Sequence, residues 1–266
     1  MNLSSALKRT STMFDKVARP RSGVVVLIYH RVGGGSSSQV DLDPTVFDAH
    51  LAHLAEHHHV VTLDHAVRAL TAGEPLEGVV ITFDDGTTDF LDYTVPALVR
   101  HGLPATLYAA TAYIDSGERF PWDAPPVSWA GLREATATGL VTVGSHTHTH
   151  ALLDRLSPAD MCDDLDRSIE LIGSNLGVVP SHFAYPKAVP GSPAAEVAVR
   201  RRFSSAALAG SRVNRSGHVD VHRLHRTPVQ RSDGQTYFEA KARGGMRLEG
   251  RLRAVHAGIK YRGDTR

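Results

Sequence analysis

Two adjacent carboxylates, Asp84 and Asp85, are the first side chains in the sequence whose types and spacing could do chemistry. They come directly after the apolar run Val79–Phe83 and before Gly86, a residue that allows a sharp turn. Because neighbouring side chains on a regular strand point to opposite faces, both acids reach one site only if a strand ends here. An ordinary solvated Asp-Asp-Gly turn would have the same residues. The pair alone therefore leaves both interpretations open.

Two histidines spaced four positions apart form the second group. His146 and His150 belong to the segment Gly144–His150, which follows the apolar run Leu140–Val143. In a helical turn, side chains at this spacing lie on one face within about 6 Å of each other, and His148 then points elsewhere. Two imidazoles and one carboxylate, with open positions for water and substrate, suit a catalytic zinc or a similar divalent ion. A His-rich surface turn is the alternative interpretation.

Short apolar runs that are rich in β-branched or aromatic residues precede both groups and recur along the chain. We expect buried strands at Val24–Tyr29, Val79–Phe83, Thr106–Ala110, Leu140–Gly144, His182–Tyr185 and Ser204–Leu208. Helical patterns lie between them, and the clearest one starts at Ser157-Pro158 and stops at Gly177. Alternating strands and helices predict a parallel sheet, and this many repeats favour a closed or nearly closed barrel. Chemistry in such a barrel lies at the C-terminal ends of the strands, where both groups fall.

Composition excludes several classes of protein. The 266 residues suit one barrel-sized domain, and 42% hydrophobic with 21% charged residues excludes a disordered or fibrous chain. The single cysteine, Cys162, excludes a disulfide scaffold and a cysteine-based zinc module, so any metal needs nitrogen and oxygen ligands. No apolar run approaches the ~18 residues that a membrane-spanning helix needs.

The charges are unevenly distributed along the chain. A net charge of +1 argues against a general attraction to nucleic acid, but residues 1–22 carry a net +4 and residues 237–266 a net +5. Loose, solvated termini are one explanation, and peripheral contact with an anionic membrane is the other. No apolar segment of a signal peptide is present, so we expect a cytoplasmic protein that could rest on the inner membrane face. The oligomeric state stays open.

The order of the motifs resembles the polysaccharide deacetylase family, which has the NodB homology domain and is carbohydrate esterase family 4. The residues that carry the resemblance read T-F-D-D-G, then S-H-T-x-T-H, then F-A-Y-P. The opening Tyr29-His30-Arg31-Val32 is similar to the branch that acts on exopolysaccharides. The resemblance implies a distorted (β/α) barrel of about seven parallel strands. It implies three segments, with an N-terminal extension at 1–22, a catalytic domain at 23–236 and a tail at 237–266.

The resemblance also implies a role for each residue of the two groups. Asp84 would be the general base, and Asp85, His146 and His150 would hold a divalent metal, expected to be Zn²⁺. This assignment agrees with the chemistry of those side chains, because a metal-bound water needs a neighbouring base.

Two histidines compete for the role of general acid. The branch with a Tyr-His opening points to His30, whereas the more usual arrangement, near the last strand, points to His225 in Leu224-His225-Arg226. We favour His30. The alternatives are a satisfied histidine at the strand end for His30 and a packing residue for His225.

The third motif departs from the family pattern and supplies candidate substrate contacts. Relatives often have arginine at the Ala184 position, and an aromatic residue followed by glycine in place of Lys187 and Ala188. We expect Lys187 to bind an anionic group of the substrate or to be a surface lysine. Tyr185, next to Pro186, could offer its backbone N–H or its ring to the acetyl group.

Aromatic residues in a loop add a further candidate. Trp122 could stack on a sugar ring, although we expect that Trp122 or Trp129 simply packs against the barrel.

The sequence therefore favours a metal-dependent hydrolase that removes N-acetyl groups from a sugar of a polysaccharide, oligosaccharide or lipid-linked glycan. One alternative is an O-deacetylase or an amide hydrolase that acts on a small molecule, because the same centre attacks any carbonyl. Another is a non-catalytic glycan-binding relative. The presence of the base beside all three metal ligands argues against a binding module.

Overall fold

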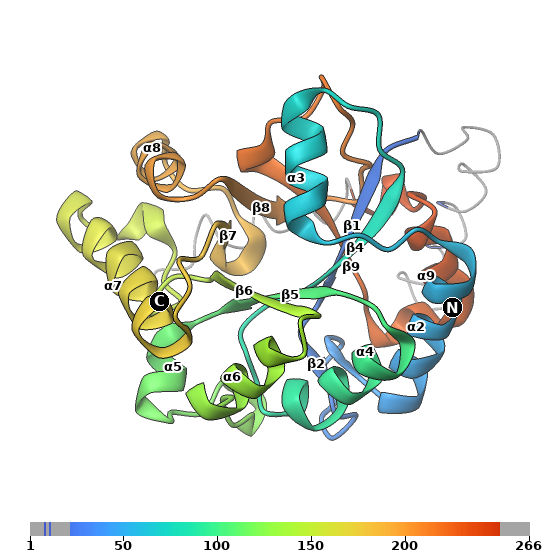
Figure 1. Cartoon of the computed structure of the whole chain (residues 1–266), viewed down its shortest axis with the longest axis horizontal. Coiled ribbons are helices and arrows are strands. Elements are labelled where there is room, and N and C mark those ends of the chain that lie inside the picture. Colours follow the sequence, from blue (N-terminus) through green and yellow to red (C-terminus); the bar gives the residue numbers. More distant parts are fainter. Residues whose placement is uncertain (1–7, 9–10, 12–21, 251–266) are drawn as a thin grey trace.

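The computed structural model describes residues 8, 11 and 22–250. Within these residues, seven parallel strands form a closed barrel, with each strand hydrogen-bonded to the next (Figure 1). In barrel order the strands are β1 (Val24–Tyr29), β4 (Gly78–Phe83), β5 (Ala105–Ala109), β6 (Val141–Ser145), β7 (His182–Ala184), β8 (Ser205–Ala209) and β9 (Leu224–Pro228). The expected barrel is confirmed, and the six expected strands match to within one residue at each end.

The strands are apolar along their whole length because both of their faces are buried. One set of alternate side chains, which includes Val26, Val80 and Tyr108, fills the barrel interior. The other set, which includes Leu27 and Ile81, packs outward beneath the helices.

Helices surround the barrel (Figure 1). They are α2 (Pro44–His57), α4 (Val95–His101) after the π-helical turn η1 (Phe90–Thr94), α5 (Thr111–Ser116), α6 (Trp129–Ala137), α7 (Pro158–Leu176), α8 (Pro193–Arg202) and α9 (Gly234–Ala242). The helix predicted after Ser157 is confirmed as α7: the Ser157 side chain accepts a hydrogen bond from the backbone N–H of Asp160, and Gly177 ends the helix at φ 71°. Short elements β2 (Arg31–Val32), β3 (Asp41–Leu42), η2 (Pro121–Asp123), η3 (Leu153–Arg155), η4 (Pro186–Ala188), η5 (Val221–Arg223) and η6 (Arg231–Asp233) lie in the loops.

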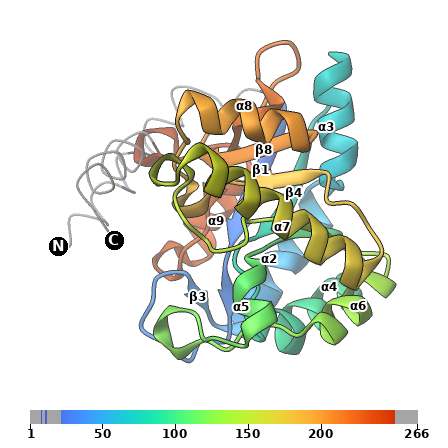
Figure 2. The ribbon, with the colours of Figure 1, turned by 90° about the vertical axis from the view of Figure 1, so that its left-hand side faces the viewer.

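One further helix, α3 (Leu63–Ala72), closes the N-terminal end of the barrel. Its apolar side chains Leu63, Val67 and Leu70 pack against interior residues such as Val24 and Val80. Figure 2 shows α3 on the opposite side of the molecule from β3, which follows the C-terminal end of β1. The C-terminal end of the barrel is thus the end left for chemistry.

The expected basic ends lie largely outside the described residues. Where the structure describes them, they pack against the barrel: the ammonium of Lys8 is 2.7 Å from the Asp233 carboxylate, and the ring of Phe238 stacks on His50 at 3.6 Å. Phe238 belongs to α9, which therefore crosses the expected division at residue 236. No helix in the described part of the chain is long and apolar enough to span a membrane.

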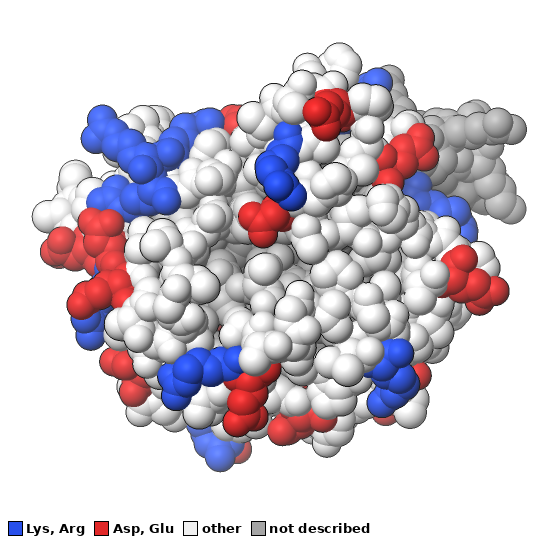
Figure 3. Space-filling view, in the orientation of Figure 1, with Lys and Arg blue, Asp and Glu red and all other residues white. Residues whose placement is uncertain are grey.

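Charged side chains on the face in Figure 3 form small clusters of both signs. Lysine and arginine gather over α8, whose last turn carries Arg200, Arg201 and Arg202, and carboxylates gather over the neighbouring α7. Ion pairs connect the cluster to carboxylates, with Arg202 Nε 2.6 Å from an Asp166 carboxylate oxygen. Neighbouring carboxylates therefore neutralise part of the positive charge of this cluster.

Candidate metal centre and active site

The acidic pair lies in a sharp turn at the C-terminal end of β4. Asp84 continues the inward alternation of the strand, and its backbone N–H donates to the Tyr29 carbonyl at 3.1 Å. Asp85 then adopts φ 74° and Gly86 φ 99°, both in the left-handed region. The strand ends at Phe83, as the sequence requires for two neighbouring acids to serve one site. Both carboxylates therefore lie at the open end of the barrel.

Three side chains converge around one point beside this turn. Asp85 Oδ1 is 3.3 Å from His150 Nε2 and 3.6 Å from His146 Nε2. One possible ligand atom from each of the three residues lies within 4.8 Å of the other two. Among the described residues, no other group of three or more His, Cys, Asp or Glu side chains is arranged to hold a metal ion. Two nitrogens and one oxygen fit a divalent ion with open positions for water and substrate.

The conformation that brings the two histidines together differs from the helical turn considered from the sequence. Strand β6 ends at Ser145, and Thr147 and His150 adopt φ 67° and φ 61°. The two ligand rings nevertheless lie 5.0 Å apart between centroids. The ring of His148 faces away from the centre, as expected, and its Nδ1 is 3.0 Å from Thr111 Oγ1.

Two of the three candidate ligands, His146 and Asp85, have the protonation states that a cation requires. Burial lowers the pKa of His146 to about 4, so its imidazole is neutral near pH 7. Its Nδ1 lies 2.7 Å from the Ala184 carbonyl, which fixes the proton on that nitrogen and directs the Nε2 lone pair toward Asp85. Burial opposes ionisation of Asp85, but the hydrogen bond from His150 and the nearby His30 lower the pKa of Asp85 well below its usual range.

Asp84 forms a buried ion pair with Arg226 of β9. Two guanidinium nitrogens lie 2.5 and 2.9 Å from its two carboxylate oxygens, and the guanidinium also lies over the ring of Tyr108 at 5.0 Å. Burial would raise the pKa of Asp84, yet the charge and hydrogen bonds of Arg226 hold it below its ordinary value. Asp84 is therefore an ionised carboxylate beside the candidate metal centre.

Sequence reasoning missed Arg226. The available signal was its position two residues after Leu224 in the final strand, which places both side chains on the inward face.

The two candidate acids lie on different sides of the barrel wall. His30 follows β1, and because Tyr29 pairs with Phe83 in register, His30 lies level with Asp84. Its Nδ1 is buried and has no hydrogen-bond partner among the described residues. His225 lies between two inward-facing residues of β9 and therefore faces outward. Burial and the nearby charges of Arg212 and Arg223 lower the pKa of His225, and neither acid of the pair is among the groups that shift it.

The motif that contains Tyr185, Pro186 and Lys187 directs fewer side chains toward the candidate site than the sequence suggested. The ring of Tyr185 is 2% exposed and packs edge-on against Phe183, and its backbone N–H donates to the Ala207 carbonyl at 3.2 Å. The ring of Tyr185 therefore packs outside the barrel interior, and its backbone N–H is already used in a hydrogen bond, so neither is directed at the candidate metal centre. Pro186 is buried, whereas Lys187 is exposed in η4 with φ 56°.

The two tryptophans have different surroundings. Trp129 packs against the core, as expected for one of them, and Trp122 is 62% exposed. The Trp122 loop is attached to the acidic turn, because the backbone N–H of Val127 donates to the Gly86 carbonyl at 2.9 Å. Tyr113 of α5, which the sequence analysis did not single out, stacks on Phe120 at 4.1 Å and meets the His150 ring edge-on at 6.5 Å.

The chain is similar to known deacetylases. The family model described as polysaccharide deacetylase matches residues 73–201. YxkH of Bacillus subtilis (strain 168), whose name gives polysaccharide deacetylase as its predicted activity, is 27% identical over 164 residues. This match covers 60% of the chain and 55% of YxkH, so the chain spans about half the length of that curated relative.

Two solved structures match most of this chain. IcaB from Ammonifex degensii is 26% identical with a TM-score of 0.72, and the match covers 84% of this chain and 98% of IcaB. The Streptococcus pyogenes deacetylase PplD, solved in complex with acetate, has a TM-score of 0.74 at 19% identity, covering 83% of this chain and 98% of PplD. The likeness to PplD concerns the fold. Taken with the motifs and their convergence at one end of the barrel, these matches show that the chain is similar to polysaccharide deacetylases over residues 73–201 and shares its fold with IcaB.

Proposed function

We propose that this protein hydrolyses the N-acetyl group of a sugar in a polysaccharide, oligosaccharide or lipid-linked glycan, with Zn²⁺ held by Asp85, His146 and His150. The observation that carries the proposal is an ionised carboxylate, Asp84, held by Arg226 beside this metal centre at the open end of the barrel. Hydrolysis of an amide needs a base for water next to a group that stabilises negative charge on the carbonyl oxygen. A binding module needs neither.

The residues divide the reaction between them. A divalent ion held by Asp85, His146 and His150 would supply Lewis-acid chemistry to the acetyl carbonyl and would make water acidic enough to react near neutral pH. Asp84 takes a proton from the attacking water. His30 gives a proton to the nitrogen as the carbon–nitrogen bond breaks, which releases the sugar amine and acetate. Arg226 keeps Asp84 ionised and fixes the direction of its carboxylate.

The first prediction separates the two candidate acids. His30→Ala is expected to lower kcat for acetate release by about 10²–10⁴-fold, the usual contribution of a general acid or base. His225→Ala, on the outer face of β9, is expected to keep kcat within a few-fold of the wild type. Steady-state kinetics on one acetylated oligosaccharide measures both variants. The opposite ranking of the two would reassign the acid to His225.

We further propose that Trp122 and Lys187 contact the substrate. An exposed aromatic face stacks on a sugar ring, and the exposed ammonium of Lys187 suits an anionic group on the glycan. Trp122→Ala is expected to raise KM several-fold with little change in kcat, because stacking away from the reacting carbonyl holds substrate and transition state equally. The comparison needs initial rates over a range of oligosaccharide concentrations. An unchanged KM would remove Trp122 from the substrate site.

The proposed function is tested by acetate release from a panel of N-acetylated and O-acetylated glycans and small acetamides, with and without a chelator. We expect chelator-sensitive release from N-acetylated glycans. Release from O-acetylated or small substrates alone would favour the alternative hydrolases. Zinc binding without turnover of any member would favour a glycan-binding protein.

A further inference from the structure

We propose that Asp164 of α7 is a positioning residue that sets the metal affinity of the centre by holding the loop between its two histidine ligands. The inference rests on the proposed metal site and adds a residue that contacts no metal ligand atom itself.

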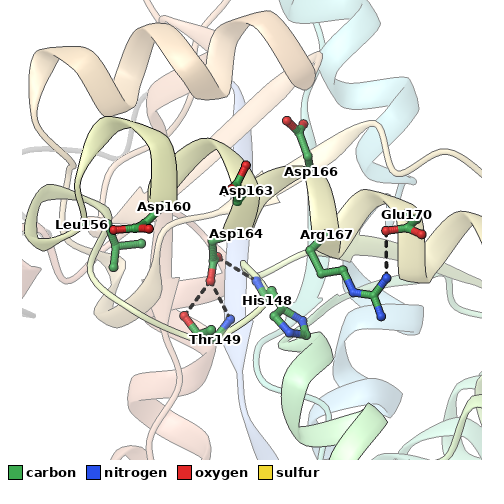
Figure 4. Close-up of a pocket in the computed structure, with 9 residues that line it drawn as sticks. All are labelled: His148, Thr149, Leu156, Asp160, Asp163, Asp164, Asp166, Arg167 and Glu170. Atoms are coloured by element: carbon green, nitrogen blue, oxygen red, sulfur yellow. Dashed lines mark hydrogen bonds and ion pairs between the residues drawn. The ribbon is translucent and has the colours of Figure 1, made fainter.

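Asp164 receives three hydrogen bonds from the loop (Figure 4). One carboxylate oxygen accepts the backbone N–H of His148 at 2.9 Å, and the other accepts the backbone N–H and the hydroxyl of Thr149 at 2.9 and 2.6 Å. Asp164 is 6% exposed, although it belongs to a helix whose other buried residues are mostly apolar. Burying a carboxylate is costly unless its oxygens accept hydrogen bonds, and both oxygens of Asp164 do so here.

The opposite edge of the same loop is held by α5. The backbone N–H groups of Thr111 and Ala112 donate to the carbonyls of Thr147 and His148 at 3.3 and 2.8 Å. The N–H groups of His148 and Thr149 therefore point to α7, and the carbonyls of Thr147 and His148 point to α5. On the α7 side, Asp164 accepts the hydrogen bonds from His148 and Thr149.

The attachment matters because the loop conformation is unfavourable on its own. Thr147 and His150 both adopt positive φ, and a β-branched residue such as Thr147 rarely does so. Residues in such conformations keep them only when surrounding contacts enforce them. Without Asp164, the two backbone N–H groups lose their acceptor, the segment relaxes toward ordinary φ values, and His150 moves relative to His146. Metal binding must then first bring His146 and His150 back together, which lowers the metal affinity.

Neighbouring carboxylates on α7 do not share this role. Asp163, Asp166 and Asp160 line the same surface groove, of about 670 Å³, together with His148 and Thr149. In Figure 4 the Asp163 and Asp166 side chains point away from the loop, and the structure gives neither a hydrogen bond to it. Asp163 is exposed and adjacent in sequence, so it offers a matched control for charge.

The test compares Asp164→Asn with Asp163→Asn in the full chain, using Zn²⁺ titration by calorimetry on metal-free protein. Both variants lose one negative charge near the centre, but only Asp164→Asn replaces an acceptor with an N–H₂ group that opposes a backbone donor. We expect the Zn²⁺ dissociation constant to rise about 10–100-fold for Asp164→Asn, the usual effect of losing a partner that orients metal ligands. For Asp163→Asn we expect less than a threefold change.

Two further measurements separate positioning from misfolding. Thr149→Val removes the hydroxyl bond at an exposed position and is expected to weaken Zn²⁺ binding by a smaller, several-fold amount. Co²⁺ loaded at saturation is expected to give an altered visible absorption spectrum in Asp164→Asn and an unaltered one in Asp163→Asn. Equal Zn²⁺ affinity of wild type, Asp164→Asn and Thr149→Val would overturn the inference. Absence of Zn²⁺ binding by the wild type would instead overturn the proposed metal site.

Discussion

Replacing Arg226 with methionine is expected to lower kcat for acetate release by at least about 10²-fold, approaching the effect of losing the base itself. The guanidinium is fully buried and makes two hydrogen bonds to Asp84. Without it, burial raises the pKa of Asp84 and favours the protonated carboxyl, which cannot accept a proton from water. Arg226→Lys keeps the charge but loses the paired geometry, so we expect an intermediate kcat.

A double-mutant cycle separates this catalytic effect from stability. Arg226→Met and Asp84→Asn are each expected to reduce the free energy of unfolding by about 3–5 kcal/mol, because each leaves a buried group without its partner. The double variant leaves no buried charge without a counter-charge and is expected to recover much of that loss. Urea denaturation measures stability, and acetate release measures kcat. Recovery of stability without recovery of kcat would identify Asp84 and Arg226 as a catalytic pair, whereas wild-type kcat in Arg226→Met would exclude it.

The barrel and its end could be predicted from the sequence because the controlling signals are local. A strand buried on both faces reads as a continuous apolar run, so Val24–Tyr29 and its counterparts stand out without knowledge of their neighbours. Gly86 marks the turn that releases two acids from one strand. The same reasoning did not identify α3 as the helix that closes the barrel, because its amphipathic pattern is the same as that of any other surface helix.

The parts of the site that sequence reasoning missed depend on contacts across the fold. Arg226 lies far along the chain from Asp84, and only closure of the barrel between β1 and β9 places it beside this proposed base. Asp164 lies in a helix whose periodic apolar residues dominate its sequence pattern. The spacing of His146 and His150 correctly brought their rings together but suggested a helical turn, because a spacing of four cannot distinguish a helix from a loop held by α5 and α7.

Removal of a metal ligand is expected to abolish both metal binding and turnover. His146→Ala deletes one of three ligand atoms, so we expect its Zn²⁺ affinity to fall by more than the ~10–100-fold that loss of an orienting partner costs, and acetate release to fall to background. His59, an exposed histidine in the segment between α2 and α3, provides the matched control, and His59→Ala is expected to resemble the wild type.

Thermal denaturation tests the proposed role of His146 in metal binding without a substrate. A ligand that binds only the folded state at 100 times its dissociation constant stabilises a protein by about 2.7 kcal/mol. For a chain of this size, that corresponds to a Tm increase of roughly 5–10 °C. We expect this increase on adding Zn²⁺ to metal-free wild type and His59→Ala, and no increase for His146→Ala. Because the shift does not depend on catalysis, an equal shift in His146→Ala would place the ion elsewhere, even if that variant releases no acetate.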